Sequence, residues 1–482
     1  SLSLMTEFSN TIGVYGKPIK NVYKLIQNGK TNDPKLFDII LNEVLNDLRL
    51  DVFPRFCNSI YYKTYIRCKA MENKKVTIKD FQPLRPLGRG AFGLVHACEK
   101  IDCGKLYAMK QINKKRVQAT DSLKTVMQER NYLAMMNSNF VTTLKYGIID
   151  DTTIHIILDL MLGGDLKYHL NNEKTFNEER SKFYAAEVLL GLEHVHSKGI
   201  IYRDLKLENI LVDDRGHVKI SDLGLSVIVM TEENKEEILR NQKKPNPNVT
   251  IHGIRGYAGT PGYTAPEVVL SHYYKHIVDF FSLGVMIYRF LCGKKPFQSK
   301  KRHRGQGHRQ HDQRRATAEL DRNVVEMEPD FPHQYFSPES KSLLKGLLCK
   351  NRENRLGRNG INEIKQHPWF DSIDFGLLEA GYLHPPYEPS LDEIHAEQQQ
   401  HIGRPPKDEI YDRTRIKPEF ERSLIKFNYA NKKVIQQEIV EVLEKVQEQR
   451  RKNNGNDVDN IISFIPESER QIKSNRCLGK CV

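Results

Sequence analysis

Two stretches of this chain place apolar residues at helical spacing, and they lie near opposite ends. In residues 33–56, Asp33 and Pro34 suit a helix start, and apolar residues then recur at steps of three and four. Residues 434–446 repeat this pattern. Because an amphipathic helix must pack on something, we expect the two ends to meet in a small helical unit. The positions of the two stripes are Phe37, Ile40, Leu41, Val44, Leu45 and Leu48, and Ile435, Ile439, Val442, Leu443 and Val446.

Between these ends the pattern changes to short strands and longer helices. Short apolar alternations begin at Phe81, and residues 154–160 form an apolar run typical of a buried strand. Residues 122–137 and 178–196 predict helices. Residues 210–212 and 218–220 predict two strands flanked by polar loops.

Length and charge narrow the class of protein. A chain of 482 residues exceeds what one hydrophobic core usually serves, so we expect two or more packed units. The net charge of +13 favours acidic partners: phosphates, anionic lipid surfaces or nucleic acid. Charge alone does not choose among them.

Cysteine use and apolar runs indicate a reduced compartment and no membrane span. The 8 cysteines show no C-x-x-C pairing, which in a long chain favours free cytosolic thiols. The longest apolar stretch, residues 278–292, is interrupted by Asp279, Ser282 and Arg289 and is shorter than a spanning helix requires. The first residues lack the basic and apolar regions of a secretory signal.

A glycine-rich stretch near residue 90 is the first candidate for chemistry. A G-x-G-x-x-G pattern alone also marks dinucleotide-binding folds, but here an alternating strand ending in Lys110 follows it. Backbone amides of such a loop can cover phosphates while the lysine reaches them. Glu129, near the middle of the 122–137 helix, is either a solvated glutamate or the ion-pair partner of Lys110, and this context favours the pair. The loop residues of the predicted ATP site are Leu87, Gly88, Gly90, Gly93 and Val95.

Residues 161–165, which follow the 154–160 strand, are a candidate nucleotide hinge whose backbone could hold an adenine ring. Asp159 and Met161 are assigned to the ATP site with it. Asp165 either accepts a ribose hydroxyl or caps the next helix, and both interpretations remain open.

Residues 200–224 carry the strongest pattern in the chain. Asp204, Lys206 and Asn209 precede one short strand, and Asp222 follows the next. A carboxylate that accepts a hydroxyl proton, a nearby lysine, an amide and a second carboxylate are the parts that phosphoryl transfer requires.

Further motifs along the chain indicate a protein family. Residues 259–267 (G-T-P-G-Y-T-A-P-E), residues 279–284 (D-F-F-S-L-G) and Arg355 in N-R-L-G follow in order. From residue 81 to residue 370 the chain resembles the eukaryotic protein kinases. The resemblance implies an α+β, bilobal kinase fold with a small antiparallel-sheet N-lobe and a mainly helical C-lobe, and it implies ATP and Mg²⁺ as cofactors.

The resemblance also assigns roles. Asp204 would accept the proton of a serine or threonine hydroxyl, and Lys206 would steady the transferred phosphoryl group. Asn209 and Asp222 would hold magnesium. Lys206 and Thr260 suit a serine/threonine enzyme. Residues with a structural role would be Arg203, Asp279, Glu267 and Arg355, the last two as an ion pair that anchors the activation segment.

Several positions resemble the G protein-coupled receptor kinases in particular. They are Tyr202 before Arg-Asp, Leu223 in D-L-G, and the flanking residues 48–53 and 378–386. Features of the beta-adrenergic and visual branches are mixed, so the branch stays open. The implied domains are a partial RGS-homology (regulator of G protein signalling) helical segment (1–80), the kinase domain (81–370), a kinase tail (371–430) and a C-terminal helix with a basic tail (431–482).

The family also implies partners and a location. These are activated G protein-coupled receptors, whose desensitisation it would promote, anionic membrane lipids and G protein subunits, with no nucleic acid. The location would be cytoplasmic, peripheral to the plasma membrane. Cys477 and Cys481 beside basic residues are either palmitoylation sites or free thiols. Two other classes stay open: a kinase with soluble substrates, and a non-catalytic signalling scaffold.

The sequence also departs from the family pattern. The helical segment before residue 81 is shorter than the family's bundle, and Leu207 replaces a proline. Insertions around residues 231–250 and 300–315 predict surface loops; His303, His308 and His311 in the second lack the spacing of a structural metal site. Gly256 stands where related kinases carry an activating threonine, so we expect activity without phosphorylation of this segment.

Overall fold

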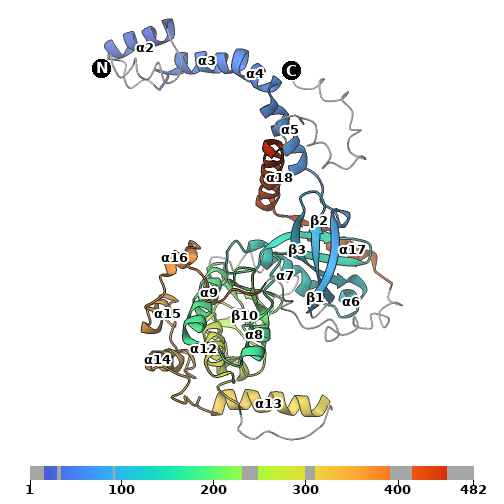
Figure 1. Ribbon diagram of the computed structural model, residues 1–482, viewed down its shortest axis with the longest axis vertical. Coiled ribbons are helices and arrows are strands. Elements are labelled where there is room, and N and C mark those ends of the chain that lie inside the picture. The colour runs from blue at the N-terminus through green and yellow to red at the C-terminus, as the bar shows by residue number, and fades with distance from the viewer. Residues whose placement is uncertain are drawn as a thin grey trace. The chain divides into compact units, whose positions relative to one another are not determined.

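The computed structural model describes residues 16–29, 34–90, 93–230, 248–298, 310–390 and 415–452, with the elements labelled in Figure 1. Within these residues the chain forms two compact units. Unit 1 consists of residues 16–75 and 435–452, and unit 2 of residues 76–434. The predicted division into at least two packed units is therefore confirmed.

Unit 1 is helical, with no strand among its described residues. Val22, Leu36 and Ile40 form a small buried cluster between its first two helices, with Val44 packed against it. Its elements are α2 (Lys17–Gln27), α3 (Asp38–Asp47), the π-helical turn η1 (Leu48–Val52), α4 (Phe53–Asn58), α5 (Ile60–Glu72) and most of α18 (Lys432–Lys452).

The helix predicted for residues 33–56 is present, but it begins at Asp38 and not at the predicted start. Helical backbone runs without a break through α3, the π-helical turn η1 and α4, and Asp33 lies outside the described residues. Helix α2 covers only the face of α3 that carries Ile40 and Val44, so Leu41 and Leu45 remain 54% and 51% exposed. The apolar stripe is real, but four of its six residues, Phe37, Leu41, Leu45 and Leu48, are exposed.

The predicted meeting of the two ends occurs through a different helix. Ile435, Ile439 and Val442 of α18 are buried, as the pattern indicated. Gln436 Nε2 of α18 donates a hydrogen bond to Glu72 Oε1 at 2.9 Å, and Glu72 belongs to α5. Residues 33–56 were therefore the wrong partner, because α2, which the sequence reading did not identify, packs on them.

Unit 2 has a small lobe built on one antiparallel sheet of order β1-β2-β3-β5-β4-β12. The predicted small sheet is thus present, and its sixth strand comes from the C-terminal tail. The strands are β1 (Phe81–Gly90), β2 (Gly93–Lys100), β3 (Lys105–Asn113), β4 (Leu144–Ile149), β5 (Thr153–Leu158) and β12 (Tyr429–Ala430). The helical elements of this lobe are η2 (Ile78–Asp80), α6 (Lys114–Ala119), α7 (Leu123–Met135), α17 (Pro418–Leu424) and η6 (Ile425–Phe427).

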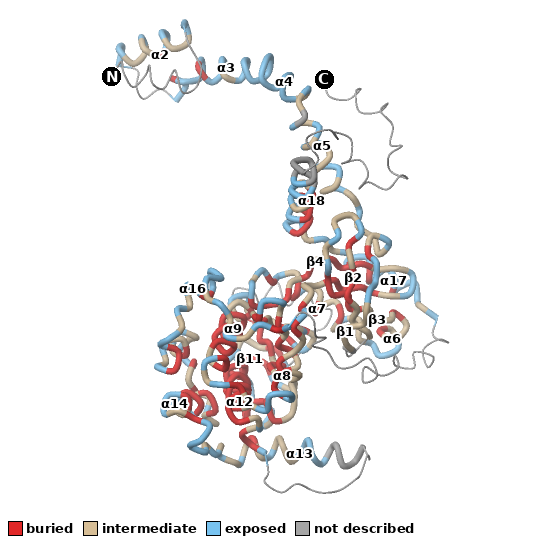
Figure 2. The backbone as a smooth tube through the Cα atoms, viewed as in Figure 1, coloured by how far each residue is buried: buried red, intermediate tan, exposed pale blue. Residues whose placement is uncertain are grey.

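The large lobe is mainly helical, and Figure 2 shows its buried backbone concentrated around α9 and α12. Asn177 caps α9 by accepting a hydrogen bond from Arg180 N, and α12 ends where Gly293 adopts φ +74°. The helices are α8 (Leu166–Glu173), α9 (Glu178–Ser197), α11 (Pro266–Val269), α12 (Ile277–Cys292), α13 (Gln310–Glu326), α14 (Pro338–Leu347), α15 (Asn362–Lys365) and α16 (Phe375–Glu379), with 3₁₀ turns η3 (Leu207–Asn209) and η4 (Pro368–Phe370).

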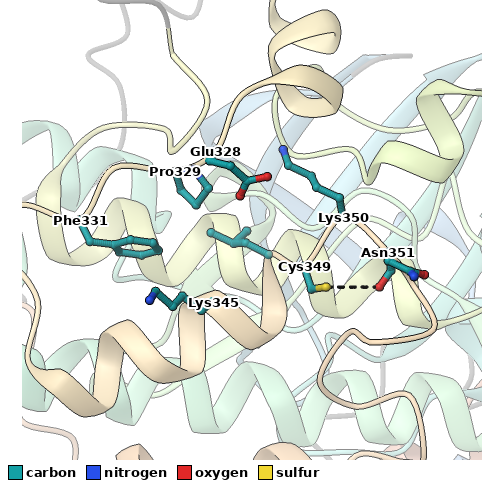
Figure 3. A pocket seen from close by; sticks show the side chains of 8 residues that line it. Glu328, Pro329, Phe331, Lys345, Cys349, Lys350 and Asn351 are labelled. Atoms are coloured by element: carbon teal, nitrogen blue, oxygen red, sulfur yellow. Dashed lines mark hydrogen bonds between the residues drawn. The ribbon is translucent and has the colours of Figure 1, made fainter.

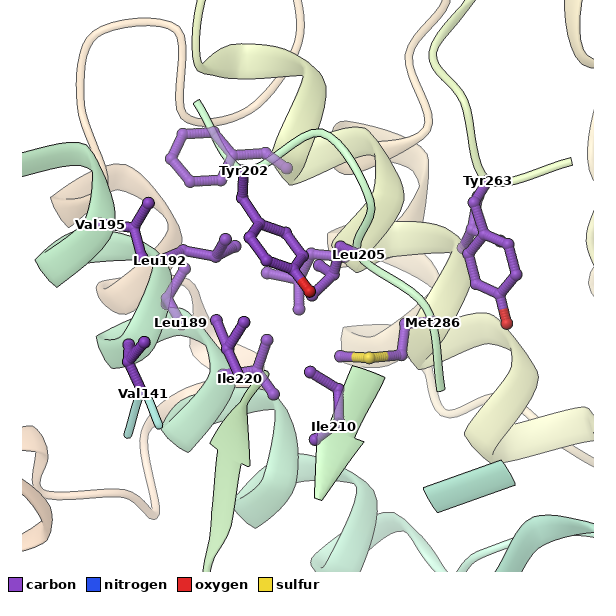
Figure 4. Close-up of a cluster of buried hydrophobic side chains, with 14 of the residues drawn as sticks. Val141, Leu189, Leu192, Val195, Tyr202, Leu205, Ile210, Ile220, Tyr263 and Met286 are labelled. Atoms are coloured by element: carbon purple, nitrogen blue, oxygen red, sulfur yellow. The ribbon is translucent and has the colours of Figure 1, made fainter. Parts of the chain in front are cut away.

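Short strand pairs of the large lobe position the polar loops. The predicted strands β7 (Ile210–Val212) and β8 (Val218–Ile220) form an antiparallel hairpin with the predicted bounds. Its side chains join α9 and α12 in the core, where Val141, Leu189, Tyr202 and Met286 gather (Figure 4). The other pairs are β6 (Ile200–Ile201) with β9 (Val227–Ile228), and β10 (Val249–Thr250) with β11 (Gly253–Ile254).

Membrane spans, cysteines and the two insertions can be described only in part. No helix in the described ranges is long and apolar enough to cross a membrane. The described cysteines are free thiols, as expected. Residues 231–247 and 299–309, which hold most of both insertions with His303 and His308, lie outside the described residues, and the side chain of His311 is likewise not described.

Candidate active site

The loop that carries Asp204 is fixed by a buried carboxylate on α12. Asp279 Oδ2 accepts the backbone N–H of Tyr202 at 2.9 Å, and Oδ1 accepts that of Arg203 at 2.8 Å. His196 Nε2 lies 2.8 Å from the same carboxylate. Since Asp279 is fully buried, these bonds hold the loop rigidly.

Arg203 links this loop to the activation segment. It has φ +69°, and its guanidinium donates to Leu225 O at 2.7 Å and to the Tyr274 hydroxyl at 3.2 Å. Tyr274 in turn donates to Gly256 O at 3.0 Å. Gly256, at the position where related kinases carry a threonine, is therefore linked to Arg203 by hydrogen bonds through the neutral Tyr274 hydroxyl. Activity without phosphorylation of this segment stays a prediction.

Both carboxylate oxygens of Asp204 accept hydrogen bonds. Thr260 Oγ1 donates to Oδ1 at 2.6 Å, and Lys206 Nζ donates to Oδ2 at 2.6 Å. Asn209 Nδ2 reaches both the backbone oxygen and Oδ2 of Asp204 at 3.0 Å. The structure thus brings together the predicted catalytic residues and orients one carboxylate from three sides.

Asn209 and Asp222 lie at the same end of the β7–β8 hairpin. Ser221 donates its backbone N–H to Asn209 O at 2.8 Å, which sets Asp222 beside the amide. Because Asn209 uses its Nδ2 on Asp204, its side-chain oxygen is left as an acceptor. Asp222, at φ +57°, adds a carboxylate. Such oxygen donors are the kind Mg²⁺ prefers, so the residues fit the ion.

Lys110 and Glu129 form the predicted ion pair. Lys110 Nζ lies 2.5 Å from Glu129 Oε1, and both side chains are buried. Burial alone would lower the pKa of Lys110, but the charges of Glu129 and Asp222 outweigh it and raise that pKa. The ammonium therefore stays charged beside the glycine-rich loop.

The glycine-rich stretch spans the end of β1 and the start of β2, and its residues 91 and 92 lie outside the described residues. Gly88 pairs with Val95, and Gly90 pairs with Gly93, while the register of β2 places Val95 opposite Lys110. A Cβ on Gly93 would lie 1.7 Å from the backbone oxygen of Gln111, so only glycine fits there. Leu87 is half-buried on β1. The loop and the lysine thus share one end of the sheet.

The residues predicted to bind the adenosine differ in their contacts. Asp159 pairs with Lys145 at 2.7 Å, so its carboxylate is occupied and its backbone is the part left for an adenine ring. Met161 is buried. Asp165 caps α8 by accepting from Tyr168 N at 2.9 Å, which realises the capping interpretation and leaves the ribose role a proposal.

Glu267 and Arg355 form a bidentate buried ion pair. Arg355 Nη1 donates to Oε1 at 2.6 Å and Nη2 to Oε2 at 2.9 Å. The arginine is 1% exposed and the glutamate 4%. The pair therefore joins the start of α11, at the end of the activation segment, to the loop after α14.

The contacts that Arg130, the neighbour of Glu129 on α7, makes with the C-terminal tail were not predicted from the sequence. Its Nε donates to Phe427 O at 3.0 Å, and it also donates to Lys426 O. Its guanidinium lies 5.7 Å from the Phe427 ring centroid and 5.8 Å from that of Tyr429. The C-terminal tail thus holds the helix that presents Glu129.

Replacing Arg130 by alanine is expected to lower kcat roughly tenfold, since about 1–2 kcal/mol of hydrogen bonding and ring contact is lost. Steady-state phosphorylation of a soluble acidic protein at varied ATP concentration measures this. Arg422→Ala, an exposed arginine on α17, should leave kcat unchanged, and R130K should recover part of the loss. A normal kcat for R130A would contradict the positioning role.

Lys295 is a second residue that the sequence reading did not single out. Its Nζ donates to Pro261 O at 2.7 Å and lies 4.7 Å from the Tyr263 ring centroid. Burial, with the nearby charge of Arg289, lowers its pKa to about 8. The loop after Thr260 is therefore bordered by positive charge.

The predicted palmitoylation sites Cys477 and Cys481 lie outside the described residues.

Comparisons with known proteins agree with this geometry. The family model for the protein kinase domain matches residues 81–370. The chain is 37% identical over 377 residues to human beta-adrenergic receptor kinase 1, covering 77% of this chain and 50% of that protein. It is 36% identical over 385 residues to G protein-coupled receptor kinase 2 of Caenorhabditis elegans, covering 78% and 50%. The chain spans about half the length of these relatives.

Proposed function

Because this chain belongs to the protein kinase family, and within it to the G protein-coupled receptor kinases, we propose that it phosphorylates serine and threonine residues of activated G protein-coupled receptors and so promotes their desensitisation. That it is a serine/threonine protein kinase follows from the family. The choice of a receptor as substrate rests on the names of the relatives.

The observation that carries the proposal is the environment of Asp204. Hydrogen bonds from Lys206, Thr260 and Asn209 hold its carboxylate where it can accept the proton of a substrate hydroxyl. Lys206 also lies 3.2 Å from Thr260 Oγ1, so its ammonium is placed to steady a phosphoryl group. A non-catalytic scaffold would not need this arrangement.

ATP and Mg²⁺ would bind at the remaining residues of the site. Asn209 and Asp222 would hold the metal, whose charge offsets that of the phosphate oxygens when bound. Lys110, fixed by Glu129, would bind the nucleotide phosphates under the β1–β2 loop, with residues 159–165 at the adenosine. Each residue thus binds or orients, and Asp204 moves the proton.

The rest of the chain would place the enzyme at a membrane. The net charge of +13 suits anionic lipids, and lipid chains on Cys477 and Cys481 would add a second anchoring signal. The helices of unit 1 would correspond to part of an RGS-homology domain and could contact G protein subunits, with residues 371–430 as the kinase tail.

The test compares substrates. The chain is incubated with ATP and Mg²⁺ and with either an agonist-activated receptor in vesicles or a soluble acidic protein. Preferential labelling of the active receptor over its inactive form supports the proposal. Equal labelling of active and inactive receptor, with faster labelling of the soluble protein, would favour a kinase with soluble substrates. Absence of transfer to either would favour a scaffold.

A further inference from the structure

A pocket in the large lobe lies outside the active site. It has a volume of about 490 Å³ and is lined by residues of the loop after α13, of α14 and of the loop that follows it (Figure 3). Pockets that bind small organic ligands typically measure about 300–1,000 Å³. Nothing in the proposed kinase reaction uses this pocket.

One wall of the pocket is apolar and preformed. Phe331, Pro329 and Leu348 supply it, and Leu348 is 2% exposed. The Phe331 ring packs edge-on against Tyr288 at 5.8 Å and Phe336 at 5.3 Å between ring centroids. Since these contacts fix the ring, the wall offers a flat apolar surface before any ligand arrives.

The opposite side carries the ammonium of Lys350, and the carboxylate of Glu328, which lines the same pocket, acts on its charge without reaching ion-pair distance. Lys350 Nζ lies 3.8 Å from the Phe297 ring centroid and donates to Val324 O. Within the described part of the chain, no carboxylate lies at ion-pair distance from it. Burial, with the nearby charge of Arg355, lowers the pKa of Lys350 to about 8, although the charge of Glu328 acts in the opposite direction. An anion beside Lys350 would add to the negative charge of Glu328 and favour the charged ammonium further.

Two residues that line the pocket also hold Arg355, whose ion pair with Glu267 fixes the end of the activation segment. The backbone oxygen of Cys349 accepts from Arg355 Nε at 2.9 Å, and that of Lys350 accepts from Arg355 Nη2 at 3.4 Å. The same guanidinium holds Glu267. A ligand that packs on residues 348–350 would thus restrain the peptide groups that position Arg355.

We propose that this pocket is a regulatory site for a small organic anion with a planar apolar body. The carboxylate would lie at Lys350 and the body against Phe331 and Leu348, while exposed Lys345 adds positive charge at the rim. A ligand bound at this site stabilises the Arg355–Glu267 pair through the backbone of residues 349 and 350. Glu328, also at the rim, selects against ligands with several negative charges.

The probe is 4-(trifluoromethyl)benzoate, titrated into the full chain and followed by fluorine NMR. From typical ligand efficiencies, we expect half-saturation at roughly 1 mM and protection of Cys349, which lines the pocket, from iodoacetamide. The thiols of Cys57 and Cys103, outside the pocket, should not be protected. The neutral 4-(trifluoromethyl)benzamide should bind at least about tenfold more weakly, because it forms no charge-assisted bond.

Three variants decide the site. Phe331→Ala and Lys350→Met should each weaken benzoate binding about tenfold, and Lys345→Glu, on an exposed side chain, should weaken it without affecting folding. Lys79→Glu, an exposed charge reversal on η2, is the matched control and should bind normally. Lack of protection at Cys349, equal protection by the benzamide, or normal binding to the Lys345→Glu protein would each overturn the proposal.

Discussion

Replacing Asp204 by asparagine is expected to lower kcat for phosphate transfer about a thousandfold, the range that a positioned general base contributes. Asparagine cannot accept the hydroxyl proton, and it removes the negative charge that holds Lys206 at 2.6 Å. Because the hydrogen bonds of the Asp204 carboxylate run to Lys206, Thr260 and Asn209 and not to Lys110 or Asp222, the KM for ATP should change much less than kcat. Initial rates of transfer from ATP, at several ATP concentrations, measure both constants.

A matched control separates the chemistry from charge and folding. Asp214, exposed in the turn of the β7–β8 hairpin, can be changed to asparagine with no expected effect on kcat. The melting temperature of Asp204→Asn should stay close to that of the unaltered chain, because asparagine can still accept from Thr260. A variant that keeps more than about a tenth of the activity would remove Asp204 from the role of base.

Sequence reasoning succeeded where function depends on local spacing. Asn209 and Asp222 flank two three-residue strands, one an apolar run (210–212) and one an alternation of apolar and polar side chains (218–220), so their meeting at one hairpin end could be derived from the pattern alone. The pairing of Lys110 with Glu129 was inferable because glycine loop, strand and helix follow in a known order. These elements carry most of the candidate site.

Contacts between distant segments could not be derived in this way. Arg130 and Phe427 are 297 residues apart, and the strand β12 is too short to show any alternation. Periodicity identifies the apolar face of a helix but not the element that covers it. For this reason the stripe at Ile40 was assigned to α18, whereas α2 packs there.

Replacing Arg355 by methionine is expected to destabilise unit 2 by about 3–5 kcal/mol, the typical cost of removing one partner from a buried ion pair. Glu267 would be left as a buried carboxylate without its bidentate partner, and the backbone oxygens of Cys349 and Lys350 would also lose a donor. The start of α11 would lose its attachment to the loop after α14. Urea unfolding of the full chain, followed through the transition of unit 2, gives the change.

Two comparisons show whether the effect comes from the buried charge. Arg358 forms an ion pair with Glu353 at 2.8 Å, but these side chains are 51% and 53% exposed, so Arg358→Met should cost less than about 1 kcal/mol. The double variant Arg355→Met with Glu267→Leu should recover part of the loss, because it removes the unpaired carboxylate together with its partner. If Arg355→Met cost no more than Arg358→Met, the anchor would not stabilise the lobe, and the link between the large-lobe pocket and the activation segment would lose its physical basis.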